Sequence, residues 1–194
     1  MHLLKHIYPA VALTIVLTVL VGGIYPFVVT GLSQIFFKEK ARGSLIEREG
    51  KVIGSRLIGQ PFKGAGYFHS RPSAAGSGYD ATASGGTNLG PTSKPLFEEQ
   101  VKARSQQRRA ENPRVKIPVD LITSSASGLD PHISPAAAVF QIPRVARERQ
   151  MAEDEVRSMV RKHTEGRQFG VLGEARVNVL ELNLTLDAAS KKGR

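Results

Sequence analysis

The first pattern along the chain is a long stretch without charge. No Asp, Glu, Lys or Arg stands between Ile7 and Phe37, and the most apolar part runs from Ile7 to Val29. Because about 20 apolar residues, at about 1.5 Å each, cross a hydrocarbon layer of about 30 Å, this pattern predicts a membrane-spanning helix. The alternative is a cleaved signal peptide, whose apolar core is only about 7–15 residues long and for which Val21-Gly22-Gly23 loosely resembles a cleavage site.

Glycine and proline interrupt the far end of this apolar stretch. The residues concerned, with the intervening tyrosine, are Gly22, Gly23, Tyr25 and Pro26. Such residues loosen a helix, and small side chains let a neighbouring helix approach closely. We therefore expect helix-packing positions in a larger membrane assembly. The chain divides into an N-terminal segment, 1–37, with the span at about 7–29, and one soluble domain, 38–194.

Beyond residue 37, short extended runs alternate with helical runs. The expected elements, in chain order, are a hairpin of Ser44–Arg48 and Lys51–Gly54, a helix from Ser93 to Arg109 ended by Asn112-Pro113, a strand Ile117–Thr123, a helix begun by Ser134-Pro135, a helix Glu153–His163 and a strand Val177–Leu186. This order predicts a single N-terminal transmembrane helix followed by one α+β (mixed α/β) soluble domain.

Two of these elements carry irregularities. The helix after Ser134 contains Pro143, which should kink it. Its expected apolar face consists of Ala138, Val139, Ile142 and Val145. In the last strand the alternation slips at Val179-Leu180, which we interpret as a β-bulge.

The stretch 59–91 is rich in Gly, Ser and Ala, a composition typical of a flexible linker. It also carries aromatic and polar residues spaced among the glycines, namely Phe62, Tyr67, Phe68, His69, Arg71, Tyr79 and Asn88. Because disordered linkers rarely contain aromatic residues, we expect an ordered loop layer packed on the core.

Basic residues outnumber acidic ones, 27 against 17, for a formal net charge of +10. Such an excess suits nucleic acid, anionic lipid headgroups or an acidic protein partner, or it reflects only a solvated surface. Lys38, Lys40 and Arg42 follow the span while only Lys5 precedes it, so flanking charge by itself would leave the soluble domain in the cytoplasm. Long domains cross membranes regardless of such charges, so this argument leaves the orientation open.

Several kinds of chemistry have no residues to carry them. The chain contains no cysteine, which excludes disulfides, thiolate metal sites and cysteine nucleophiles. It has no Gly-x-x-x-x-Gly-Lys-Ser/Thr loop, and it lacks the Asp-Lys-Thr-Gly run of the phosphorylated subunit of ion-pumping ATPases. The five histidines lack zinc-site spacing, and neither Ser84 nor Ser127 stands in a Gly-x-Ser-x-Gly elbow. We therefore expect no catalytic residue and no metal ligand.

Two loops concentrate the polar residues that suit a binding site. The first contains Tyr67, His69, Arg71 and Ser73, and the second contains Ser125, Ser127, Gly128, Asp130, His132 and Ser134. The second loop ends at a helix N-terminus, whose N–H groups could hold an anion. The structural alternative is that Ser134 caps the helix and Asp130 orders the turn. Ser125, Asp130 and His132 are the residue types of a hydrolytic trio, although residues so close in sequence rarely adopt that geometry.

At these loops the sequence becomes recognisable, because it resembles KdpC, the C subunit of Kdp-type potassium-transporting P-type ATPases. The matching runs, in order along almost the whole chain, are Gly23–Pro26, Gly43–Ile46, Gly54-Ser55, Leu57–Gln60, Tyr67–Ala74, Ser84–Leu89, Ser125–Pro131, Gln141–Ala146 and Val177–Leu184. These runs add Asn88, Arg144 and Asn178 to the candidate interaction residues. Departures are slight, such as Thr87 where the family often has Ser.

The resemblance implies a non-catalytic subunit of a bacterial inner-membrane pump. Its partners would be a pore-forming potassium subunit, an ATP-hydrolysing subunit and a small fourth subunit, with no nucleic acid involved. It would bind no cofactor firmly, and it would act as a catalytic chaperone that raises the ATP affinity of the hydrolysing subunit. The family's soluble domain lies on the outer, periplasmic side, away from cytoplasmic ATP. An effect on ATP would therefore pass through the span or the pore as a coupling free energy.

Two other function classes remain open on the residues alone. One is a membrane-tethered periplasmic enzyme using Ser and His, which a serine-reactive probe should label. The other is a basic adaptor for lipid or nucleic acid, which predicts steeply salt-dependent binding. Aromatic residues interleaved with Lys and Arg, typical of nucleic-acid binders, are not seen. Direct ATP binding by the Ser/Gly loops is a further variant.

Overall fold

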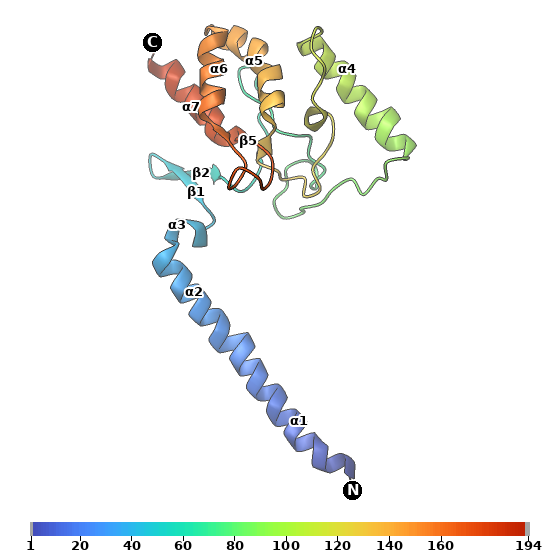
Figure 1. Cartoon of the computed structure of the whole chain (residues 1–194), viewed down its shortest axis with the longest axis vertical. Coiled ribbons are helices and arrows are strands. Elements are labelled where there is room, and N and C mark those ends of the chain that lie inside the picture. Colours follow the sequence, from blue (N-terminus) through green and yellow to red (C-terminus); the bar gives the residue numbers. More distant parts are fainter. Residues whose placement is uncertain (1, 193–194) are drawn as a thin grey trace. The chain divides into compact units, whose positions relative to one another are not determined.

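The computed structural model describes the backbone of residues 2–192 and the side chains of residues 5–190. It contains two compact units, Met1–Ile53 and Gly54–Arg194 (Figure 1). The first unit is helical with one hairpin, and the second combines helices with a small sheet. The predicted class, one N-terminal apolar helix followed by a mixed α/β domain, is confirmed.

One long apolar helix dominates the first unit and is drawn in blue in Figure 1. The elements in order are α1 (His2–Val19), the π-helical η1 (Leu20–Ile24), α2 (Tyr25–Phe36), α3 (Lys38–Ala41), β1 (Leu45–Arg48) and β2 (Lys51–Ser55). Within the described residues one helix, Lys5–Phe36, is long and apolar enough to cross a membrane. The predicted hairpin is also confirmed, with β1 paired to β2 across Glu49 and Gly50, both at positive φ.

The helix changes geometry where its glycines stand. Leu20–Ile24 forms a π-helical turn, a wider turn that is often found at functional sites. A Cβ added to Gly22 or Gly23 would meet no atom within 4 Å, so both glycines present an open face. Together with neighbouring apolar side chains they line a shallow hollow. The predicted loosening of the helix is therefore confirmed at this point.

The second unit packs helices around a short antiparallel sheet. Its elements are η2 (Pro95–Val101, π-helical), α4 (Lys102–Glu111), η3 (Val119–Leu121, a 3₁₀ turn), β3 (His132–Ile133), α5 (Pro135–Arg149), α6 (Glu153–Lys162), β4 (Thr164–Glu165), β5 (Arg176–Asn178) and α7 (Val179–Lys192). The strand order is β3-β5-β4, so the central strand is the last in sequence. Val177 pairs with Ile133 on one side and with Thr164 on the other.

The buried core of this unit comes mainly from α5, α6 and α7. Its members are Phe68, Leu121, Ile133, Ala137, Ala138, Phe140, Ile142, Val145, Ala146, Val156, Val160, Val177, Val179, Leu182 and Leu186. The prediction for α5 holds at three of its four apolar positions. It is wrong at Val139, which is 41% exposed, because the helix turns about 100° per residue and buries Phe140 instead.

Two predicted strands are wrong. Residues after Asn178 form α7, not a strand, so the proposed bulge does not exist. The buried positions Val179, Leu182 and Leu186 follow helical spacing, and Asn178 caps the helix by accepting a hydrogen bond from the N–H of Glu181. The second strand, Ile117–Thr123, contains instead the 3₁₀ turn η3, where the Thr123 hydroxyl donates to the carbonyl of Val119.

The other helices follow the prediction. The helix expected from Ser93 toward Arg109 is η2 followed by α4. The helix expected at Glu153–His163 is α6, which ends one residue earlier. Pro143 lies within α5, which continues to Arg149.

The Gly- and Ser-rich stretch 59–91 has no helix or strand, yet it is part of the packed structure. Phe68 and Ala75 are fully buried, and Phe68 belongs to the core cluster. The prediction of an ordered loop layer is therefore confirmed. A loop without regular structure must find other partners for its backbone groups, and those partners define the site.

Candidate functional site

Two buried amide side chains take the place of a neighbouring strand along the loop. Asn183 of α7 accepts from the N–H of Phe68 at 2.9 Å and donates to the carbonyl of the same residue at 2.9 Å. Gln141 of α5 does the same for His69, accepting at 2.8 Å and donating at 3.1 Å. Gln141 and Asn183 are 0% and 1% exposed. Consecutive loop residues are thus paired to two different helices, as a strand would be paired within a sheet.

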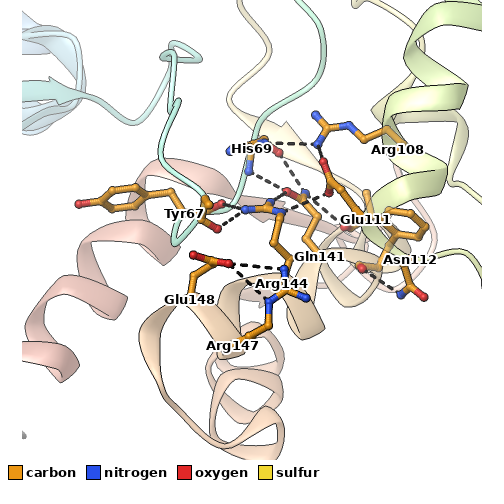
Figure 2. A network of polar contacts seen from close by, with 12 residues as sticks. Tyr67, His69, Arg108, Glu111, Asn112, Gln141, Arg144, Arg147 and Glu148 are labelled. Atoms are coloured by element: carbon orange, nitrogen blue, oxygen red, sulfur yellow. Dashed lines mark hydrogen bonds and ion pairs between the residues drawn. The ribbon is translucent and has the colours of Figure 1, made fainter.

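Arg144 extends this pairing toward the start of the loop (Figure 2). Its Nη1 donates to the carbonyls of Ala65 and Tyr67, and its Nη2 donates to Oε1 of Gln141 at 2.8 Å. Its Nε donates to Oε2 of Glu111 at 3.2 Å. The side chain is only 8% exposed, so a buried guanidinium with one carboxylate partner joins the loop, α4 and α5.

Glu111 is shared between two arginines. Its Oε1 accepts from Arg108 at 2.6 Å, and Nη1 of Arg108 lies 3.3 Å from Nδ1 of His69. The Nε2 of His69 lies 3.1 Å from the carbonyl of Gly64, so the tautomer protonated at Nε2 satisfies both contacts. Burial lowers the pKa of His69 below its usual range, and the charge of Arg144 lowers it further. The neutral imidazole is therefore a structural link in this network.

Arg149 holds the other side of the loop. Its Nε donates to the carbonyl of Gly66, its Nη2 donates to Oδ1 of Asp187 at 2.8 Å, and its guanidinium lies 4.5 Å from the ring centroid of Tyr67. The Tyr67 hydroxyl in turn donates to Oδ2 of Asp187 at 3.3 Å. Every carbonyl from Gly64 to His69 therefore accepts a hydrogen bond from a side chain.

The two loops singled out in the sequence lie against each other. The hydroxyl of Ser73 donates to the carbonyl of Gly128 at 2.6 Å. Nearby, the N–H of Gly85 donates to the carbonyl of Ser127 at 2.9 Å. Gly128 has φ +67°, and a Cβ there would lie 2.6 Å from the Ala75 nitrogen. Only glycine fits this close approach of two backbones.

Asp130 serves the turn and an ion pair rather than catalysis. Its Oδ1 accepts from the N–H of His132 at 2.9 Å, and its Oδ2 pairs with Arg71 at 3.2 Å. Burial alone would raise the pKa of Asp130, but hydrogen bonds from His132 and the charge of Arg71 bring it below its usual range. Asp130 thus contacts His132 twice, through the backbone N–H of the turn and through the imidazole, whose Nδ1 lies 3.7 Å from Oδ1. Ser125 is buried.

The helix N-terminus that could have held an anion already has a carboxylate of the same chain beside it. Ser134 caps α5, its hydroxyl accepting from the N–H of Ala137 at 3.0 Å, as the structural alternative predicted. Asp120 accepts from both the N–H and the hydroxyl of Ser134, at 2.8 and 3.2 Å. A carboxylate of the same chain therefore occupies the position that a bound anion would take.

The structure separates the remaining candidates from this cluster. Asn178 donates to the carbonyl of Arg56 at 2.9 Å and caps α7. Asn88 is exposed and adopts φ +54° within its loop. Sequence reasoning missed Gln141, Asn183 and Glu111 as members of the site. The sequence could have indicated that the two amides are buried, since each lies among the apolar residues that form the buried face of its helix.

A basic hollow of about 540 Å³ adjoins the loop. Its charged lining residues are Lys63, Arg104 and Arg108, and His69 completes it without any Asp or Glu. Arg104 donates to the carbonyl of Ile122 at 3.2 Å and to the Ser124 hydroxyl at 3.3 Å, and burial lowers its pKa. This lining suits an anion. Among the described residues no group of three His, Asp or Glu side chains is placed to bind a metal.

Comparison with known proteins gives one consistent result. The family model of the K+-transporting ATPase c chain, KdpC, matches residues 7–188. Several similar proteins carry the name potassium-transporting ATPase KdpC subunit, and three of them illustrate the likeness. The relative from Koribacter versatilis (strain Ellin345) is 60% identical over 94% of each chain. The one from Acidobacterium capsulatum is 54% identical over 95% of this chain and 98% of its own. The one from Rhodopseudomonas palustris (strain BisB5) is 52% identical over 98% of this chain and all of its own.

The structure combines one helix long and apolar enough to cross a membrane with a mixed α/β unit whose buried polar side chains bind backbone groups of a loop. The chain belongs to the KdpC family, the c chain of K+-transporting ATPases. It is thus an accessory subunit of a potassium-transporting ATPase and not its catalytic subunit. The resemblance seen in the sequence is confirmed.

Proposed function

We propose that this chain stabilises the potassium-transporting ATPase complex and raises the ATP affinity of the hydrolysing subunit. Its partners would be that subunit, a pore-forming potassium subunit and a small fourth subunit. The proposal rests on family membership together with one observation. Side chains donate a hydrogen bond to every carbonyl of the loop Gly64–His69, and we call this set of contacts the loop clamp. Because that clamp makes the loop part of a rigid body, the unit is suited to transmit a conformational bias to a partner.

The ATP effect has a direct test. The complex is reconstituted with and without this chain, and the ATP concentration for half-maximal hydrolysis is measured in each case. Allosteric coupling of ordinary size predicts that omission raises this concentration by about 5-fold or more. Equal values would contradict the chaperone role, while loss of the other subunits from the complex would support the stabilising role alone.

The second unit is proposed to lie on the periplasmic side of the inner membrane. The chain has no cysteine, so a single introduced cysteine reports its own accessibility. Lys116→Cys, at an exposed loop position, should react with an impermeant maleimide in intact cells. The control His6→Cys, just ahead of the apolar stretch 7–29, should react only after permeabilisation. The reverse pattern would place the unit in the cytoplasm.

The open face of η1 is the proposed packing site for a partner helix. Gly22 and Gly23 leave room on that face, and Tyr25 and Pro26 begin the next helical segment. Gly23→Leu fills this face, and a Cβ at this position meets no atom within 4 Å, so recovery of partner subunits in detergent should fall. Val16→Leu, an apolar exchange elsewhere on the helix, is the control. If both variants recover the partner subunits equally well, Gly22 and Gly23 do not form the packing site.

A second candidate activity is direct contact with ATP, which the basic hollow favours and which requires the second unit to lie in the cytoplasm. Arg104 has no carboxylate partner among the described residues, and phosphate groups would supply the missing negative charge. The full chain in detergent is titrated with ATP at low salt, alongside Arg104→Gln and the exposed control Arg109→Gln. Loss of binding in the first variant alone supports the contact, and absence of binding by the parent chain rejects it.

A further inference from the structure

The loop between β4 and β5 is a short ordered hairpin. Gln168 and Leu172 form a reciprocal pair of backbone hydrogen bonds, each 2.9 Å long. Phe169, Gly170 and Gly173 adopt φ values of +53°, +77° and +74°. The strands below the loop are paired at Thr164 with Val177 and at Glu165 with Arg176. The tip, residues 168–172, is therefore held in one shape by its own hydrogen bonds.

This tip presents apolar side chains to solvent. Phe169 is 92% exposed, Val171 is 72% exposed and Leu172 is 57% exposed. Phe169 is the most exposed of the large hydrophobic side chains that the structure describes. Isolated exposed apolar residues are common, but three of them on an ordered five-residue tip indicate an interaction site.

The charges around the tip cancel in pairs. Arg167 donates to both carboxylate oxygens of Glu174 at 2.7 Å, and Arg176 pairs with Glu165 at 2.9 Å. Residues 164–176 contain no Lys, Trp or Tyr. A lipid-binding loop usually has an excess of Lys or Arg, with Trp or Tyr at the interface. A neutral polar rim around an apolar centre is instead the anatomy of a protein–protein contact.

We propose that this hairpin docks into an apolar pocket on another protein subunit of the ATPase, with Phe169 as the anchor and Val171 and Leu172 beside it. The inference deepens the proposed stabilising function and rests on it. An aromatic side chain on a preorganised tip loses little conformational entropy on insertion. The Arg167–Glu174 and Arg176–Glu165 pairs would then lie at the rim, where they exclude water without needing an oppositely charged partner.

The test uses the full chain expressed with its complex in native membranes. A photoreactive phenylalanine analogue replaces Phe169 in one chain and the exposed Leu57 in a matched control. Ultraviolet light should join position 169, but not position 57, to a protein subunit of the ATPase. An adduct with lipid alone at position 169 would overturn the inference in favour of membrane contact, and absence of any adduct would overturn it as well.

A pair of substitutions gives a second measurement. Phe169→Asn removes the aromatic ring yet tolerates positive φ, and Leu57→Asn removes an exposed apolar side chain elsewhere. Complex recovered through a tag on the chain should fall about 5-fold or more for Phe169→Asn, the loss expected of an anchor residue. Recovery for Leu57→Asn should equal that of the parent chain.

The outcomes separate the two proposals. If the parent chain brings down no ATPase subunit, the proposed function fails and the docking inference fails with it. If the parent chain brings down the complex and Phe169→Asn does so equally well, only the docking inference fails. The thermal unfolding temperature of each purified chain is measured in parallel, and it should be unchanged because both side chains are exposed.

Discussion

Gln141 and His69, 72 positions apart in the sequence, are joined by two hydrogen bonds between one amide side chain and one residue's backbone. The same Oε1 also accepts from Arg144 at 2.8 Å. A single buried amide thus fixes the loop, α5 and the buried guanidinium together. This arrangement explains how a stretch rich in Gly and Ser becomes an ordered layer without forming a strand.

Replacing this amide should destabilise the unit. Gln141→Leu keeps the volume but removes the hydrogen-bond partners of the N–H and the carbonyl of the half-buried His69. Because an unsatisfied buried polar group costs about 1–3 kcal/mol, the free energy of unfolding should fall by at least about 2 kcal/mol. Denaturant unfolding of the purified chain measures it. The control is Gln106→Leu, an exposed position on α4, and a similar loss in both variants would refute the argument.

Two arginines of the same helix should behave in opposite ways. Arg144 is 8% exposed and paired with Glu111, whereas Arg147 is 71% exposed and paired with Glu148, and both pairs are visible in Figure 2. Arg144→Met removes one of the two arginines bound to Glu111, together with the donors to two loop carbonyls and to Gln141. It should therefore lower the free energy of unfolding by about 3–5 kcal/mol. Arg147→Met should change it by under about 0.5 kcal/mol. The two values come from the same unfolding experiment, and near-equal losses would count against a buried role for Arg144.

Gly128 should not accept a side chain. An added Cβ would lie 2.6 Å from the Ala75 nitrogen and 2.7 Å from the Gly85 carbonyl oxygen, at a φ of +67°. Gly128→Ala should therefore lower the free energy of unfolding by about 2 kcal/mol or more. At Gly90 a Cβ would meet nothing within 4 Å, so Gly90→Ala should stay within about 0.5 kcal/mol of the parent. Thermal unfolding of both variants checks the contrast.

His69 should make stability depend on pH. Its folded-state pKa lies below the usual value of about 6.5, since burial and the charges of Arg144 and Arg108 disfavour the imidazolium more than the hydrogen bond with Gly64 and the charge of Glu111 favour it. The unfolded chain therefore binds more protons as pH falls below about 6.5, and the stability present above that pH is progressively lost. His69→Gln, which retains a donor, should flatten the change in unfolding temperature between about pH 7.5 and about pH 5.5. Equal slopes in parent and variant would exclude His69 as the cause.

Some helices could be predicted from the sequence because the residues that start them lie within the helix or next to it. The start of α5 was predictable because Ser134 and Pro135 act on the first turn of that helix, and Ser134 does cap it. The prediction of a strand at Val177–Leu186 was wrong because its apolar residues fit both an interrupted strand alternation and the spacing of a helix. The capping side chain of Asn178, which decides for the helix, is itself held by the carbonyl of Arg56, 122 positions away.

The candidate site was half visible in the sequence. Ser73 and Gly128 were chosen on two separate loops, and the structure brings them to 2.6 Å. Their roles were not visible, because a glycine excluded by a facing backbone looks like any other glycine. Gln141 and Asn183 were missed because an amide usually lies at the surface, and only the surrounding apolar residues show otherwise.

The sequence by itself determined a helix long and apolar enough to cross a membrane, because about 20 apolar residues without a charge make such a helix recognisable from local pattern alone. It also determined the absence of cysteine chemistry and, through runs spread along the whole chain, the family. Only the tertiary structure decided that Phe68 is buried, that Asn183 pairs with its backbone across 115 positions, and that Phe169 is left in solvent. The reason is physical: burial and pairing depend on what a residue meets in space, and two phenylalanines in glycine-containing loops differ only in that.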